Sequence, residues 1–125
     1  MKASINSLHH QENDWLRELE FYKQELSVLT DRLEEVAAKN TSNETMAQVE
    51  HFQNRFILLK EQHDILRHDN AARSARLNEM AKAIPTHIEE KFVADNDDMH
   101  KRMVDFFSSF RDTRFEFYKF LSKVL

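Results

Sequence analysis

One seven-residue hydrophobic repeat runs through almost the whole of this chain. Its apolar residues follow one another at alternating steps of three and four, which is the spacing of helices that pack against partner helices. In the first third of the chain a single position of the repeat, Glu12, is polar. This pattern predicts one helix over about residues 4–39, with these apolar residues on its buried face: Ile5, Leu8, Trp15, Leu19, Tyr22, Leu26, Leu29, Leu33 and Val36.

Two short interruptions divide the repeat into three helices. The chain has no Gly and one Pro, so its turns must be made from other residues. At the first interruption an Asn can adopt the left-handed conformation in place of Gly, and Thr41 with Glu44 forms a capping box for a second helix over about 42–83. At the second, Pro85 ends that helix, and Thr86 with Glu89 begins a third over about 86–124.

The second and third helices carry the same repeat. On the second it comprises Val49, Phe52, Phe56, Leu59, His63, Leu66, Asn70, Arg73, Leu77, Met80 and Ile84. On the third it comprises Phe92, Asn96, Met99, Met103, Phe106, Phe110, Thr113, Phe117, Phe120 and Val124. The stretch 95–98 favours caps and turns, so a kink or restart is possible there.

Three helices of similar length joined by short turns must lie antiparallel to their sequence neighbours. We therefore predict an all-α fold, an elongated up-down-up three-helix bundle resembling a coiled coil, which dimerisation could complete. The whole chain, 1–125, forms a single domain of this kind.

Composition and charge narrow the range of functions. Without Gly or Cys, the chain lacks phosphate-cradling loops, disulfides and thiolate nucleophiles. A formal net charge of −4 argues against nucleic acid as a partner. No stretch is apolar enough for a membrane span or a signal peptide, so we expect no membrane partner and a cytoplasmic protein. No catalytic constellation is apparent, and we expect neither an enzyme nor a cofactor.

Polar groups are expected to meet inside one end of the bundle. With the first turn centred near residue 41, Glu12 lies opposite Asn70, with Arg73 one turn away. The second turn places His100, or Asn96, at the same level. A buried Glu12 would need Arg73 beside it, with Asn70 bridging. We favour a structural layer that determines the helix register. The alternative is a small-ligand or metal site, for which the candidate ligands are His9, Glu12 and His100.

His63 also falls on the buried repeat, and a satisfied interior histidine is the favoured interpretation. The seven histidines do not have the spacing of a diiron bundle, because no Glu stands three residues before a His.

Apolar residues outside the repeat point to an interface. On the third helix a second stripe comprises Phe107, Tyr118, Leu121 and Leu125. The other two helices add Phe21, Leu58 and Ile65, which are expected to form a second patch. Because exposed apolar surface usually marks an interface, we predict self-association as a homodimer or contact with another protein. The alternative is a wider monomeric core.

Part of the sequence resembles a known family. The runs Trp15–Lys23, Arg32–Val36 and Val49–Asn54 are similar to those of a family of small bacterial, coiled-coil-like helical proteins. The resemblance covers about the first 55 residues and implies a bacterial cytoplasmic setting, with no activity. In architecture, a long three-helix bundle with a Trp in its first helix is also similar to spectrin-type bundles, without transfer of residue roles.

Overall fold

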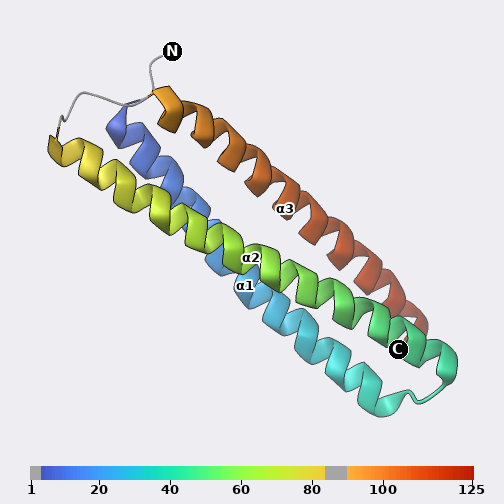
Figure 1. Ribbon diagram of the computed structural model, residues 1–125. Helices are drawn as coiled ribbons and strands as arrows, with labels where there is room; N and C mark the ends of the chain where they lie inside the picture. Colours follow the sequence, from blue (N-terminus) through green and yellow to red (C-terminus); the bar gives the residue numbers. More distant parts are fainter. Residues whose placement is uncertain (1–3, 84–89) are drawn as a thin grey trace.

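The computed structural model describes residues 4–83 and 90–125, which form three long helices. They are α1 (Ile5–Lys39), α2 (Asn43–Ala83) and α3 (Glu90–Val124). The helices lie side by side along one axis, with α2 antiparallel to the other two (Figure 1). The predicted all-α up-down-up bundle is confirmed. The predicted turn at Pro85, its capping box at Thr86 and Glu89, and the repeat position Ile84 fall outside the described residues.

Serine hydroxyls begin the first two helices. At the start of α1, the Ser4 hydroxyl accepts a hydrogen bond from the Ser7 backbone N–H at 3.0 Å, and the Ser4 backbone N–H donates one to the Ser7 hydroxyl at 3.1 Å. At the start of α2, the Ser42 hydroxyl accepts from the backbone N–H of Thr45. The predicted cap at Thr41 is therefore one residue too early, because the serine hydroxyl, and not the threonine, reaches the free N–H of the first turn.

The turn between α1 and α2 needs no left-handed residue. Asn40 ends α1 in an extended conformation, with φ of −125°, and its backbone N–H and side chain both bond to the carbonyl of Val36. No residue in the ranges 4–83 and 90–125 has a positive φ. The expected left-handed Asn is therefore wrong, and an extended linker explains how a chain without Gly can turn here.

The third helix is continuous through residues 95–98. Asn96 does not compete with the helical backbone, because its side chain is bonded to residues of the other two helices. Tertiary contacts thus override the local preference of this acidic stretch for a turn.

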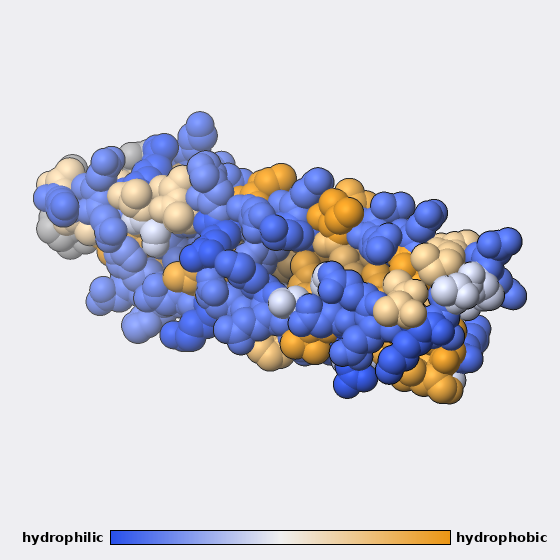
Figure 2. Space-filling view, turned by 90° about the horizontal axis from the view of Figure 1, so that it is seen from below, coloured by the Kyte–Doolittle hydropathy of each residue, from blue (hydrophilic) through white to orange (hydrophobic). Residues whose placement is uncertain are grey.

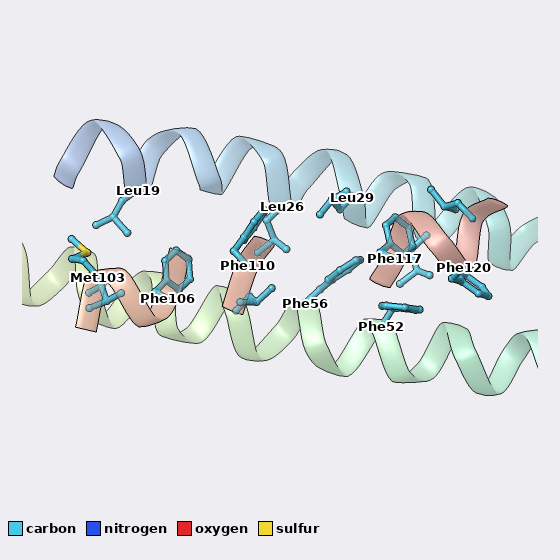
Figure 3. Close-up of a cluster of buried hydrophobic side chains, with 14 of the residues drawn as sticks. Leu19, Leu26, Leu29, Phe52, Phe56, Met103, Phe106, Phe110, Phe117 and Phe120 are labelled. Atoms are coloured by element: carbon cyan, nitrogen blue, oxygen red, sulfur yellow. The ribbon is translucent and has the colours of Figure 1, made fainter. Parts of the chain in front are cut away.

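The buried core follows the seven-residue repeat. Every repeat position within the described residues is buried or half-buried, and Leu121 is the one buried residue of this part of the chain that lies outside the repeat. Aromatic rings of α2 and α3 pack against one another within this core. Phe52 meets Phe117 at 5.3 Å between ring centroids, and Phe56 meets the same ring edge-on at 5.2 Å. Figure 3 shows these rings pointing between the helices, toward the leucines of α1.

None of the helices within the described residues is long and apolar enough to cross a membrane.

We expect Phe110→Ala to lower the free energy of unfolding by about 3–5 kcal/mol, because this fully buried ring would leave a cavity between all three helices. The matched control is Phe115→Ala on the same helix, whose ring is 65% exposed and which should change stability by less than about 0.5 kcal/mol. Urea unfolding followed by circular dichroism measures both. Equal losses for the two variants would contradict the assignment of the core.

Candidate functional site

A layer of polar side chains divides the core into two parts. Among the described residues, a large apolar cluster extends from Trp15 toward the end containing the α1–α2 turn, and a small one lies at the other end around Leu8 and Phe92. Between them, the buried repeat positions of α1, α2 and α3 are occupied by Glu12, Asn70 and Asn96. All three helices are therefore polar at the same level of the bundle.

Glu12 and Asn70 face one another across α1 and α2, as the turn position predicts. The side-chain amide of Asn70 donates to the backbone carbonyl of Glu12 at 3.2 Å. The Glu12 carboxyl is 1% exposed and accepts a hydrogen bond from the Ser74 hydroxyl at 2.9 Å. Ser74 was not among the residues predicted from the sequence for the polar layer, although this residue lies four positions after Asn70 and so shares its helix face.

Arg73 joins the layer to α3 without pairing directly with Glu12. Its guanidinium donates to the side-chain oxygen of Asn96 at 3.1 Å and lies over the ring of Phe92 at 4.1 Å. Asn96 in turn donates to the side chain of Gln11 at 3.0 Å. Arg73 lies near enough to Glu12 for its charge to act on the carboxyl, but the hydrogen bond of its guanidinium goes to α3. The predicted bridge by Asn70 between these two side chains is wrong, because the Asn70 amide bonds to the backbone of Glu12.

These hydrogen bonds connect all three helices at one level. If a helix slid by one turn, its polar members would enter an apolar layer without partners, which costs free energy. This arrangement is that of a layer favouring one register.

His100 lies outside this layer. It is exposed and packs beside Trp15 at 6.1 Å between ring centroids. Of the two residues predicted as alternatives for the α3 position in the layer, Asn96 occupies it. The reason is that Asn96 occupies a buried repeat position, and His100 is the residue following one. His9 does approach Glu12, at 3.8 Å. The part of the chain that is described holds no group of three or more His, Asp or Glu side chains placed to bind a metal.

Burial controls the protonation of Glu12. Removal from water raises the pKa of its carboxyl, and the Ser74 hydrogen bond and the charges of Arg73 and His9 offset this only in part. One carboxyl oxygen, Oε2, has no hydrogen-bond partner among the described residues. The layer therefore holds a carboxyl group whose neutral form is favoured by its surroundings.

His63 is buried in the large cluster, as expected for an interior histidine. Its Nε2 lies 2.8 Å from the carbonyl oxygen of Leu19, and its Nδ1 lies 3.1 Å from the carboxylate of Asp64. Both partners are acceptors, so only the doubly protonated ring can donate to both at once.

A groove between α1 and α3 gathers residues from both predicted patches. It has a volume of about 630 Å³. Phe21 of α1 and Val104 of α3 line it and are 52% and 49% exposed. Below them, the ring of Tyr22 stacks on that of Phe107 at 5.0 Å between centroids, and Phe21 meets Tyr22 edge-on at 5.3 Å. We call Phe21, Tyr22, Val104 and Phe107 the aromatic groove.

The remaining interface candidates are distributed differently from the prediction. Leu121 is only 6% exposed and belongs to the core, because its position on α3 faces inward. Ile65 lines a depression between α2 and α3, so it does not join Phe21, which lies between α1 and α3. Leu58, seven residues before Ile65, is also exposed on α2, and Tyr118 and Leu125 are exposed on α3.

Exposed apolar surface is spread unevenly over the face of the bundle shown in Figure 2. In the face shown in Figure 2, apolar residues gather mainly over the half that carries the α1–α2 turn, and the other half is mostly hydrophilic. The polar layer lies toward the hydrophilic half, since it adjoins the beginning of α1.

Comparison of the chain with family models, curated proteins and solved structures finds no match. The resemblance to a bacterial helical family therefore stays a prediction.

The raised pKa of Glu12 predicts a specific pH dependence. The folded state holds this proton more tightly than the unfolded state, whose carboxyl titrates near 4.5. The contribution of this protonated carboxyl to the free energy of unfolding is thus fully present below pH 4.5. It is lost as the pH rises through the higher folded-state pKa. We expect Glu12→Gln, which cannot titrate, to gain stability relative to the unmodified protein over that range.

Urea unfolding of both proteins at a series of pH values measures this difference. The control is Glu61→Gln, which makes the same chemical change at an exposed site on α2, outside the polar layer. A pH-independent difference for Glu12→Gln would show that the carboxyl is solvated.

Proposed function

We propose that this protein is not an enzyme and acts by protein–protein contact, with the aromatic groove as its contact surface. The observation that carries the proposal is the half-exposed pair Phe21 and Val104, which lies over the stacked rings of Tyr22 and Phe107. In water, a contiguous apolar surface of this kind gains free energy when a partner covers it.

The surroundings of the groove have the composition of a protein interface. Asp14, Arg17, Glu18 and Arg111 line its margins, so an apolar centre is bordered by charged side chains. Protein interfaces combine an apolar, aromatic centre with a polar rim, and arginine and tyrosine are enriched among the residues that contribute most to binding.

The floor of the groove is held in place by the core. Tyr22 contacts the buried rings of Phe106 and Phe110, at 6.1 and 4.7 Å between centroids. A partner would therefore bind a surface that needs little ordering, which lowers the entropic cost of association.

Site-specific photo-cross-linking in the native cells tests the proposal. The photoreactive residue p-benzoylphenylalanine replaces Phe21 in the full chain, and Leu58 on α2 serves as the control because it is equally exposed outside the groove. We expect irradiation to link the chain to a discrete protein from position 21, with at least about fivefold lower yield from position 58. The mass of the adduct identifies the partner.

No adduct from position 21, or equal yields from the two positions, would contradict the aromatic groove as the contact surface.

A further inference from the structure

We infer that the partner at the aromatic groove is a second copy of this chain, bound antiparallel about a two-fold axis at the level of Phe21 and Phe107. This inference rests on the proposed function and adds the identity and orientation of the partner. The evidence is the distribution of charge along the groove.

The two ends of the groove carry opposite net charge. On the side nearer the start of α1 lie Asp14, Arg17 and Glu18, of which Asp14 and Arg17 form an ion pair, so Glu18 leaves a net negative charge. On the other side lies Arg111, which leaves a net positive charge.

A neighbouring ion pair preserves this asymmetry. Glu25 of α1 binds Arg114 of α3 at 3.1 Å just beyond Arg111, and the two charges cancel. The apolar centre thus separates a negative end from a positive end.

Only one orientation of a second copy brings opposite charges together. Because α1 and α3 run in the same direction, an antiparallel copy places its positive end over the negative end of the first, and the reverse contact follows by symmetry. A parallel copy would superpose like charges at both ends, which is unfavourable. In the antiparallel dimer, Glu18 of each copy lies at the same height along the axis as the partner's Arg111. The apolar centres of the two grooves then cover one another.

The groove lies near the middle of α1, which extends from Ile5 to Lys39. Two copies related by an axis at Phe21 therefore overlap along nearly their whole length, without leaving one half of either bundle uncovered. The inferred assembly closes on itself and does not propagate into a filament.

Charge reversal at the two ends tests the orientation. Glu18→Arg makes both ends of the groove positive, and Arg111→Glu makes both negative. We expect each variant alone to dimerise at least about tenfold more weakly than the unmodified chain at low salt, as two repulsive contacts replace two attractive ones. When the two variants are mixed, both contacts become attractive, and dimerisation should return to within about threefold.

Sedimentation equilibrium of the purified full chains measures these dissociation constants, and circular dichroism checks that each variant is folded. Glu61→Arg is the control, since it makes the same charge change on an exposed part of α2. It should leave dimerisation unchanged.

The possible outcomes separate this inference from the proposed function. If the purified chain is monomeric, or if its dimerisation is insensitive to both reversals, the antiparallel dimer is wrong. If in that case position 21 still cross-links to a different protein, the proposed function stands with another partner. If position 21 gives no adduct either, both are wrong.

Discussion

The whole structure depends on the burial of one continuous seam on each of three helices. An isolated helix of this length gains little from its backbone alone, and its stability comes from the apolar face that it buries. Here phenylalanine rings occupy five of the ten repeat positions of α3, and they interlock with Phe52 and Phe56 of α2 and with leucines of α1. Each helix is therefore stabilised by its packing against the other two. The way in which the three seams pack also determines where grooves form between the helices at the surface.

The polar layer adds specificity to this burial. Apolar seams that repeat every seven residues permit neighbouring registers of similar energy. The hydrogen bonds of Asn70 with Glu12, and of Asn96 with Arg73 and Gln11, favour one register. The register matters for the surface as well, because it brings Phe107 beside Tyr22 and Arg114 beside Glu25. A polar layer near one end thus helps to position an apolar groove farther along the bundle.

The sequence predicted the helices, their antiparallel order and the buried repeat, because these depend on periodicity and on turn positions. It also predicted that Asn70 lies opposite Glu12, since a short turn determines which residues share a level. It did not predict that Phe21 shares a groove with Phe107 and lies away from Ile65. Turn positions give the level of a residue along the axis, but not on which side of the α1–α2 pair the third helix lies.

The smaller errors have equally local causes. Leu121 follows a repeat position, and its side chain is buried with the core residues of the large cluster. Arg73 has a long side chain that can reach partners on either neighbouring helix, so its choice of Asn96 and Phe92 over Glu12 depends on the packed structure. Such choices depend on three-dimensional distances that no spacing along the chain encodes.

Small-angle X-ray scattering of the unmodified chain tests the central claim most directly, because it reports mass and length together. The monomer has a mass of 15.0 kDa, and α2, the longest helix within the described residues with 41 residues, is about 62 Å long. A side-by-side antiparallel dimer predicts twice that mass with a maximum dimension close to that of one bundle. A particle of monomer mass at all concentrations, or a dimer nearly twice as long, would contradict the antiparallel dimer.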